Sequence, residues 1–341
     1  MIKVGVCGLG MMGNTHLDAY TRLEGVEVAA VADANPDRLS GSEKAGGNIE
    51  GQAQGGFDLQ KVKRYTDAKE LIDDPDIDVV DICLPTPAHL RFAIQALDAG
   101  KHVLIEKPLA RTSDQARQLV EAADRAAGLS MVAMCMRFWP GWSWLKETID
   151  DKTYGRVQAA TFRRVASHPG GAFYLDGDAC GGAALDLHIH DTDFVQYCFG
   201  MPRAVSSRGY SSLTHKIDHI TTQYHYDGIP LVVAEGGWAM AKSFPFTMQY
   251  AVNFERATAV FDLAAEEPLT IYYGDGGSEA ISLDPGMGYE HELAYFIRCI
   301  KEGSEPTAVT LRDASLALRI VEAEVESARS GQVVEVASAA V

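Results

Sequence analysis

Three glycines near the start of the chain, spaced as G-x-G-x-x-G, constrain the fold more than any other feature. The segment Gly8–Gly13 follows the apolar run Ile2–Cys7 and leads into a helix-like stretch near Met11–Arg22. Glycine allows a tight turn at the first position, a close backbone approach at the second, and close packing of helix on strand at the third. The sequence therefore predicts a strand, a glycine turn and a helix as the start of a parallel sheet.

Short apolar runs alternate with helix-like segments through residues 1–127, which is typical of a parallel sheet with crossover helices. This pattern predicts a Rossmann domain, that is, a doubly wound parallel sheet. The further strands expected are Val26–Ala32, Val79–Leu84, His102–Ile105 and Met131–Cys135, and the further helices are Pro87–Ala99 and Ser113–Ala127.

The pattern changes in residues 128–341, where runs of alternating strands predict an α+β domain with an open, largely antiparallel sheet. We expect this second domain to bind the substrate and to form oligomers. Its expected strands are Val157–Val165, Ile220–Tyr226, Leu231–Ala239, Thr247–Phe254 and Ala257–Leu263, and its expected helices are Ala184–Phe199, Glu290–Lys301 and Leu311–Ser330.

Length and composition narrow the class of protein. A chain of 341 residues is too long for one ordinary core, which favours two domains. The net charge of −17 argues against nucleic acid, whose phosphates require clustered Lys and Arg. No apolar run is long enough for a membrane helix, and the first residues resemble a strand rather than a signal peptide, so we expect a cytoplasmic protein. The six cysteines contain no C-x-x-C pair, which favours small buried side chains over disulfides.

The segment Gly41–Phe57 interrupts the alternation of strands and helices with six glycines. Such a composition buries little apolar surface, so we expect a mobile surface loop. A lid over a bound ligand is the alternative.

An acidic residue at the end of the second expected strand indicates which ligand the glycine turn binds. Asp33 lies 20 residues after Gly13, where a carboxylate can accept hydrogen bonds from both hydroxyls of a ribose and repel a 2′-phosphate. The next arginine is Arg38. The combination predicts a dinucleotide site that prefers NAD to NADP. The alternative, a glycine turn followed by a helix-capping aspartate before Pro36, explains less of the pattern.

Two further segments carry a resemblance to a known family. Glu106-Lys107-Pro108 follows the strand at His102–Ile105, and a D-x-x-x-H pair, Asp186 and His190, lies in a later helix. With the glycine turn, these resemble the glucose–fructose oxidoreductase / inositol dehydrogenase / MocA (Gfo/Idh/MocA) family over nearly the whole chain. The resemblance implies an NAD(P)-dependent oxidoreductase that acts on CH–OH groups, with Lys107, Asp186 and His190 at the catalytic positions.

The resemblance also implies which residues contact the cofactor. Glu106 and Lys107 would contact the nicotinamide ribose, a cis peptide bond would precede Pro108, and the loop Cys83–His89 would run along the nicotinamide. The expected cofactor-binding residues are Gly8, Gly10, Met11, Met12, Gly13, Asp33, Leu84, Pro85, His89, Glu106, Lys107 and Arg137.

The chemistry of the three catalytic candidates is consistent with hydride transfer from a secondary alcohol. His190 is the natural base for the hydroxyl proton, because an imidazole pKa of about 6.5 lies near working pH. Asp186, four residues earlier, would share one helix face with it and orient the ring or bind a neighbouring hydroxyl. Lys107, past the end of a parallel strand, could stabilise negative charge on the substrate oxygen.

A metal site is the competing interpretation of the same helix. Asp186, His188, His190 and Asp193 offer two imidazoles and two carboxylates, a set that suits zinc. His188 and His190 are two residues apart and would point in different directions on a helix, so we expect no metal. His188 itself could contact the substrate or make a buried hydrogen bond.

The family acts mostly on sugars, inositols and related polyols, so the resemblance implies a substrate of that class. His168 and Tyr174, in the polar stretch Ser167–Asp178, are candidate substrate contacts. Three tryptophans could stack on a sugar ring, but their spacing favours packing at a helix start; these are Trp139, Trp142 and Trp144.

Two other functions remain open, and both use the same fold. One is a glycoside hydrolase in which bound NAD oxidises a sugar transiently, and the other is a non-catalytic NAD-binding regulator. The mixed strand Leu231–Met240 fits a covered sheet face, so we also expect a homodimer or homotetramer.

Overall fold

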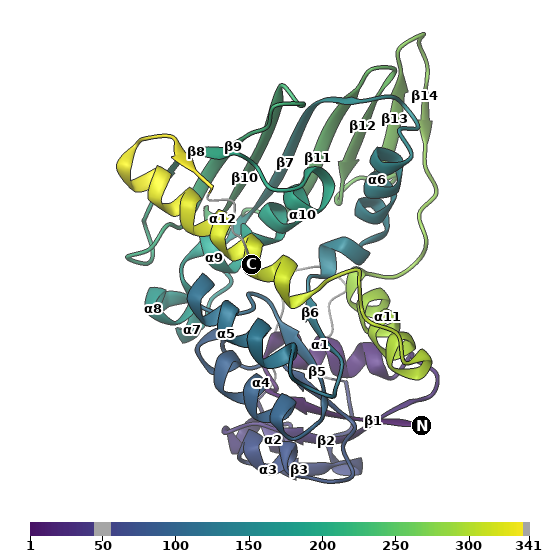
Figure 1. The fold of residues 1–341 in the computed structure, drawn as a ribbon, viewed down its shortest axis with the longest axis vertical. Coiled ribbons are helices and arrows are strands. Elements are labelled where there is room, and N and C mark those ends of the chain that lie inside the picture. The colour runs from purple at the N-terminus through teal and green to yellow at the C-terminus, as the bar shows by residue number, and fades with distance from the viewer. Residues whose placement is uncertain (44–55, 337–341) are drawn as a thin grey trace. The chain divides into compact units, whose positions relative to one another are not determined.

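The computed structural model describes residues 1–43 and 56–336 and contains two compact units (Figure 1). Unit 1 consists of residues 1–135 and 287–315, and unit 2 of residues 136–286 together with the chain from Leu316 onward. The sequence suggested one boundary near residue 127. The division differs because strand β6 (Ser130–Ala133) completes the sheet of unit 1, and helix α11 (Gly288–Glu302) contacts both β6 and the first helix of that unit.

Unit 1 is built on a parallel sheet of six strands in the order β3-β2-β1-β4-β5-β6. This is the Rossmann order, in which ligands bind beyond the carboxyl ends of the strands at the reversal between β1 and β4. Strand β4 is buried at every residue, as a strand covered on both faces requires. The remaining strands are β1 (Ile2–Cys7), β2 (Val26–Ala32), β3 (Lys63–Tyr65), β4 (Val79–Ile82) and β5 (His102–Glu106).

Helices cover the sheet of unit 1 in two groups. Helices α3, α4 and α5 contact one another in series, and α1 contacts α11. Side chains of Asn35, Asp67 and Thr112 cap the N-termini of α2, α3 and α5. The bounds are α1 (Met11–Tyr20), α2 (Pro36–Ser40), α3 (Ala68–Ile72), α4 (His89–Asp98) and α5 (Ser113–Ala123), with short 3₁₀ turns at Leu59–Lys61 and Thr86–Ala88.

Unit 2 is built on a nine-stranded sheet in the order β14-β13-β12-β11-β7-β10-β9-β8-β15. Every described neighbour pair is antiparallel except β7 with β10, which confirms the largely antiparallel sheet expected from the sequence. The strands are β7 (Val157–Ser167), β8 (Ala204–Tyr210), β9 (His219–His225), β10 (Leu231–Met240), β11 (Thr247–Phe254), β12 (Ala257–Asp262), β13 (Leu269–Tyr273), β14 (Ser278–Ala280) and β15 (Val334–Glu335).

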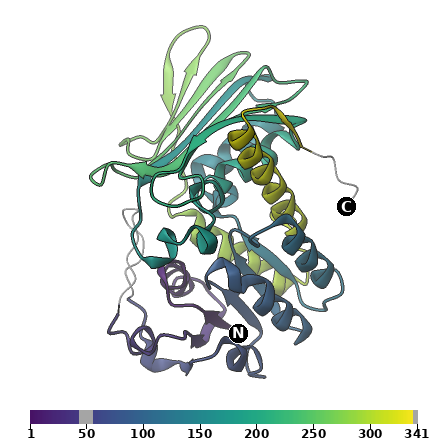
Figure 2. The same ribbon diagram turned by 90° about the vertical axis from the view of Figure 1, so that its left-hand side faces the viewer.

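Helices of unit 2 pack on one face of this sheet, which Figure 2 shows from the side. Trp142 is fully buried among Phe162, Phe194, Tyr250 and Phe261, so this tryptophan packs the core. The helices are α6 (Pro140–Asp150), α7 (Ala172–Leu175), α8 (Gly177–Cys180), α9 (Ala183–Asp186), α10 (Ile189–Phe199) and α12 (Leu311–Ser330), whose residues up to Ser315 are assigned to unit 1. A 3₁₀ turn at Cys135–Phe138 lies at the start of the unit.

The single helix expected over residues 184–199 is two helices. The backbone N–H groups of Leu187 and His188 both donate to the carbonyl of Ala183, which interrupts the regular ladder between α9 and α10. Asp186 ends the first helix and His190 lies in the first turn of the second. The two side chains are therefore carried by successive helices rather than by one helix face.

The six cysteines are free, and all but Cys198 are buried, as expected for small buried side chains. Among the described residues, no helix is long and apolar enough to cross a membrane. Most of the glycine-rich segment, residues 44–55, lies outside the described residues.

Candidate active site

The glycine turn after β1 is shaped by contacts that only glycine permits. Gly8 has a φ of +97°, and a Cβ at Gly13 would lie 1.8 Å from the carbonyl oxygen of Gly8. At Gly10, by contrast, a Cβ would meet nothing within 4 Å, so space lies open above the turn. No side chain caps α1 at Gly10. The helix start therefore presents backbone and positive dipole to that space, as a pyrophosphate group requires.

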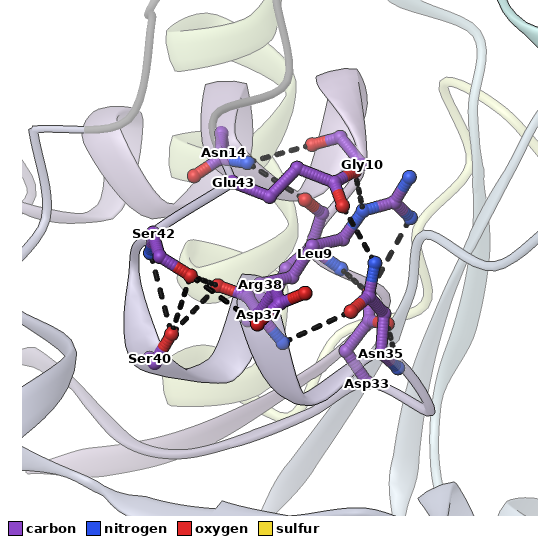
Figure 3. A network of polar contacts seen from close by, with 10 residues as sticks. All are labelled: Leu9, Gly10, Asn14, Asp33, Asn35, Asp37, Arg38, Ser40, Ser42 and Glu43. Atoms are coloured by element: carbon purple, nitrogen blue, oxygen red, sulfur yellow. Dashed lines mark hydrogen bonds and ion pairs between the residues drawn. The ribbon is translucent and has the colours of Figure 1, made fainter.

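Asp33 is held against this turn at the carboxyl end of β2 (Figure 3). Its two carboxylate oxygens accept hydrogen bonds from the backbone N–H of Leu9, at 2.7 Å, and of Asn35, at 2.8 Å. The side chain is nearly buried. Because backbone groups on both sides orient it, the carboxylate stands in a fixed position beside the glycine turn.

Arg38, which the sequence offers only as the next arginine after Asp33, lies in this site. Its guanidinium lies 3.8 Å from the Asp33 carboxylate and donates from Nε to Oε1 of Glu43 at 3.0 Å. Asn35 donates to the other oxygen of Glu43 at 2.7 Å, and these two hydrogen bonds lower the pKa of Glu43. Figure 3 shows the group. A hollow beside it is lined by Leu9, Asn14, Arg38, Ser40, Gly41, Glu43, Phe57, Asp58, Leu59 and Gln60.

The segment after β5 is tied to the loop after β4 by a buried histidine. The Lys107–Pro108 bond is cis, and the backbone N–H of Lys107 donates to its neighbour Glu106 at 3.0 Å. The ring nitrogens of His89 lie 2.9 Å from the carbonyl oxygen of Pro108 and 2.7 Å from that of Leu84. Burial lowers the pKa of His89, so the neutral ring donates to one of these carbonyls.

In unit 2, two buried ion pairs hold helix α10, which carries His190. Arg137 donates to both carboxylate oxygens of Asp193, at 2.8 and 2.7 Å. Arg164 does the same to Asp191, at 2.8 and 3.2 Å. Such two-point pairs fix direction as well as charge. Arg137 is thus bound within unit 2, whereas the family resemblance assigned it to the cofactor.

His188 is fully buried and faces the interior of unit 2. Its Nε2 lies 3.4 Å from the hydroxyl of Tyr224 and 3.6 Å from Glu324. Burial by itself lowers its pKa, but the carboxylates of Glu324 and Asp191 together outweigh burial and raise it. A Cβ at Gly236 would lie 2.4 Å from the ring, so a glycine in β10 makes room for this histidine. This geometry favours the buried hydrogen bond over the substrate contact.

The other candidates of unit 2 lie near the start of α9. His168 Nε2 is 3.3 Å from the carbonyl oxygen of Tyr174, and both rings pack against Trp238. Two members of the alternative metal set, His188 and Asp193, are engaged with Glu324 and Arg137. The geometry therefore does not favour a metal at that helix.

The cofactor candidates of unit 1 gather where the fold predicts a ligand. Gly8, Asp33, Leu84 and Lys107 each follow the carboxyl end of a parallel strand, β1, β2, β4 and β5. Asp186 and His190, in unit 2, are partly exposed, as is Lys107 in unit 1. The fold, the glycine turn and Asp33 together define unit 1 as a dinucleotide-binding Rossmann domain, and the residues present fit NAD.

Family comparisons agree and go further. Residues 2–134 match the model described as "Oxidoreductase family, NAD-binding Rossmann fold", and residues 142–260 match the "GFO/IDH/MocA C-terminal domain". The chain belongs to the Gfo/Idh/MocA oxidoreductase family.

Named relatives resemble the chain over most of its length. D-apiose dehydrogenase of Paraburkholderia graminis is 27% identical, covering 98% of this chain and 90% of the relative. Myo-inositol 2-dehydrogenase of Thermotoga maritima is 26% identical, covering 93% of each. A levoglucosan dehydrogenase in complex with NADH has a similar fold, with a TM-score of 0.86 and 22% identity over 99% of this chain and 100% of that one.

Proposed function

We propose that the protein is an NAD-dependent dehydrogenase that oxidises a secondary hydroxyl of a sugar, an inositol or a related polyol. The observation that carries the proposal is that Lys107, Asp186 and His190, which the family resemblance assigns to the catalytic positions, are all partly exposed. Around them, neighbours such as Ile105, Leu185 and Asp191 are buried. The dehydrogenase names of the relatives support the same reaction class and substrate class.

Each residue has a distinct task in this reaction. Bound NAD supplies the acceptor for the hydride that leaves the substrate carbon. A ring nitrogen of His190 takes the hydroxyl proton, and the ammonium of Lys107 donates a hydrogen bond to the oxygen as its negative charge grows. Asp186 orients the imidazole or accepts a hydrogen bond from a neighbouring substrate hydroxyl. Glu106 and Lys107 also hold the nicotinamide ribose.

We further propose that NAD is preferred to NADP. The fixed carboxylate of Asp33 accepts from ribose hydroxyls and repels a 2′-phosphate. Arg38 is the nearby group of opposite sign, and Glu43 engages its guanidinium at 3.0 Å. The two carboxylates near the turn, Asp33 and Glu43, thus outweigh the single positive charge of Arg38, which a 2′-phosphate would need as its partner.

The direct experiment incubates the protein with NAD and a panel of inositols, aldoses and sugar acids and follows the absorbance of NADH. We expect accumulation of NADH with one substrate class and a large loss of turnover in Lys107→Ala and His190→Ala, while NAD still binds. Silence across the panel with NAD binding confirmed by thermal shift would favour the glycoside hydrolase, which restores its NAD, or the regulator. Near-normal turnover in both variants would overturn the catalytic assignment.

We also retain the proposal of a homodimer or homotetramer, formed through the partly exposed side of the unit 2 sheet. Val233 and Val260 are only half-buried there, and the pair Arg163–Glu235, at 2.8 Å, lies beside them. Light scattering at micromolar concentration tests this, and a monomeric mass would contradict it. The cytoplasmic location expected from the sequence stays a prediction, testable by cell fractionation.

A further inference from the structure

A cluster of buried ionisable side chains lies in unit 1, and of its members the proposed reaction uses only Glu106. It draws on α1, β4, β5 and α11, and its members are nearly or fully buried. We call it the His16 cluster; it consists of His16, Tyr20, Asp81, Cys83, Glu106 and Glu292.

The ring of His16 lies between two carboxylates. Its Nδ1 is 2.9 Å from Oδ2 of Asp81, and its Nε2 is 3.1 Å from Oε1 of Glu106. The second contact is an ion-pair distance and not a hydrogen bond, since Nε2 has no hydrogen-bond partner among the described residues, but it places a carboxylate beside that nitrogen. A neutral imidazole carries one N–H, so it can donate to only one of two acceptors. Carboxylates at both nitrogens therefore favour the doubly protonated, positive ring.

The surrounding groups agree with this charge. Burial alone would lower the pKa of His16, but the polar neighbours of Nδ1, Cys83 and Asp81, raise it well above its ordinary value. The Asp81 carboxylate supplies the negative charge, because the buried thiol stays protonated. Tyr20 donates its hydroxyl to Asp81 at 3.0 Å, and the Cys83 thiol faces the other Asp81 oxygen at 3.4 Å. Burial raises the pKa values of both Tyr20 and Cys83, so each remains a neutral donor.

Glu292 approaches the same ring from α11. Its Oε1 lies 3.9 Å from His16 Nε2, and neither of its oxygens has a hydrogen-bond partner among the described residues. Burial raises the pKa of Glu292 well above its ordinary value, so it remains a neutral acid. The cluster then contains one positive ring, the carboxylates of Asp81 and Glu106, and an uncharged carboxyl.

The two carboxylates that face His16 come from neighbouring strands, β4 and β5, next to the loops that carry candidate site residues. Glu106 uses its other oxygen to accept the backbone N–H of Lys107, at 3.0 Å. A chain of contacts thus runs from α1 through His16 and Glu106 to the backbone of Lys107. We propose that His16 is a positioning residue: its positive ring bridges Asp81 and Glu106 and thereby fixes Lys107. The inference rests on the proposed function in giving Lys107 its catalytic role.

A metal ion is the alternative use of these atoms. His16, Asp81 and Cys83, and likewise His16, Glu106 and Glu292, bring ligand-type atoms within 4.8 Å of one another. A ligating imidazole must give up its proton from the ligating nitrogen, which leaves at most one N–H for two carboxylates. The carboxylates at both ring nitrogens favour the protonated ring instead. Metal analysis of the purified protein decides, and a stoichiometric ion bound through His16 would overturn the proposal.

The principal variant is His16→Gln, which has no charge and cannot bridge both carboxylates. Because a displacement of about 1 Å in a reacting group costs about 100-fold in rate, we expect kcat to fall roughly 10- to 100-fold. The NAD dissociation constant should change less than about threefold, because the glycine turn and Asp33 are untouched and only the contacts of Glu106 and Lys107 to the nicotinamide ribose are affected. An unchanged kcat, or an equal loss of NAD affinity and kcat, would overturn the proposal.

The matched control is His102→Asn, a histidine of unit 1 outside the cluster. Nδ1 of His102 accepts the backbone N–H of Leu129 at 3.0 Å, a bond that the Asn side chain can replace. Its kcat and NAD affinity should both remain as in the parent chain. An equal kcat loss in this control would attribute the His16→Gln result to general damage and overturn the assignment.

A second variant, Asp81→Asn, keeps the shape of the cluster and tests the charge should His16→Gln fail to fold. Removing one carboxylate lowers the pKa of His16, so activity should decline with rising pH at a lower pH than in the parent chain. An identical pH profile would contradict the proposal. Nitrogen NMR of labelled histidine gives a readout without substrate: at pH 7, above the ordinary imidazole pKa, the His16 ring should show two protonated nitrogens, and one protonated nitrogen would overturn the inference.

Lys107→Ala, measured in parallel, separates this inference from the proposed function. Normal turnover in Lys107→Ala removes the catalytic role of the lysine and with it the positioning role of His16, while the turnover itself leaves the dehydrogenase proposal standing. A strong loss in Lys107→Ala together with parent-like turnover in His16→Gln leaves the function standing and removes only the positioning role.

Discussion

The candidate site residues of unit 1 and unit 2 are held in place by different means. In unit 1 the backbone positions the site: the glycine turn shapes it, and backbone N–H groups orient the carboxylates of Asp33 and Glu106. In unit 2, helix α10 is held by side chains, through the Arg137–Asp193 and Arg164–Asp191 pairs. Backbone arrangements leave a local signature in the sequence. Ion pairs between residues 56 and 27 positions apart leave none.

The largest effect should come from breaking a buried pair of unit 2. Asp193→Asn leaves the guanidinium of Arg137 buried without its counter-charge, which typically costs about 3–5 kcal/mol of the free energy of unfolding. Urea denaturation, followed by a probe in unit 2, measures this. The control is Asp150→Asn, which breaks the exposed Lys146–Asp150 pair on α6 and should cost less than about 1 kcal/mol. Similar losses of unfolding free energy in the two variants would show that burial does not determine how much the Arg137–Asp193 pair contributes to stability.

The glycine turn of unit 1 should separate ligand binding from stability. In Gly10→Ala the new methyl group meets no protein atom within 4 Å, so thermal stability should be unchanged. It occupies the space expected for the pyrophosphate, so NAD affinity should fall about 100-fold. In Gly13→Ala the methyl group would lie 1.8 Å from a carbonyl oxygen, so stability and affinity should fall together. Calorimetric titration and thermal unfolding test both, and unaltered NAD affinity in Gly10→Ala would move the pyrophosphate away from this turn.

A smaller effect should follow from the side chain that unit 1 places beside this turn. Asp33→Ala removes two ribose hydrogen bonds, worth about 1 kcal/mol each, and should weaken NAD binding about 10- to 30-fold. NADP binding should strengthen or stay constant, because a repulsive charge has gone. Dissociation constants for both cofactors measure the ratio, with Asp58→Asn, on the rim of the hollow, as the control that should leave it unchanged. An unaltered ratio in Asp33→Ala would assign the discrimination to Arg38 and Glu43.

The contrast between the units explains what the sequence could predict. Strands β1, β2 and β11 and helix α12 lie at the residues expected, because each has a clear apolar period. Strand β3 was missed because its three residues, Lys63–Tyr65, form a short polar edge. The break between α9 and α10 was missed because it depends on a shared backbone carbonyl and on the buried contacts of His188.

The same reasoning applies to the candidate site. The glycine turn and Asp33 could be identified from spacing alone, because local geometry requires these residue types. Arg38 was noted only as the next arginine, since its approach to Asp33 and Glu43 depends on how α2 folds. His16 lies in an apolar helix three residues after Gly13, and the sequence near it contains no residue that indicates a partner for its ring. Its role becomes visible only when β4, β5 and α11 bring three carboxyl groups around the ring.

The His16 cluster differs from the rest of the unit 1 site because buried side chains, and not backbone groups, form it. This difference should be measurable as a dependence of stability on pH. Unfolded Glu292 loses its proton above its ordinary pKa of 4.5, whereas the folded carboxyl keeps its proton because burial raises its pKa. The unfolded state then binds fewer protons, so this group makes the folded state less stable as pH rises between the two values. In Glu292→Gln that loss is absent. The stability of the variant relative to the parent should therefore increase between pH 6 and pH 7, by at most about 1.4 kcal/mol for one proton.

Urea denaturation at the two pH values, with Glu290→Gln as the control on the same helix, makes the measurement. Glu290 is partly exposed and paired with Arg22, so its variant should run parallel to the parent chain over this range. If the Glu292→Gln curve is parallel as well, Glu292 ionises alike in the folded and unfolded states. The cluster would then contain three charged carboxylates around one ring and need a further cation. That outcome would favour a metal ion in the His16 cluster. It would also contradict the contrast between the two units, in which the His16 cluster contains an uncharged carboxyl and each buried carboxylate of the α10 pairs faces one arginine.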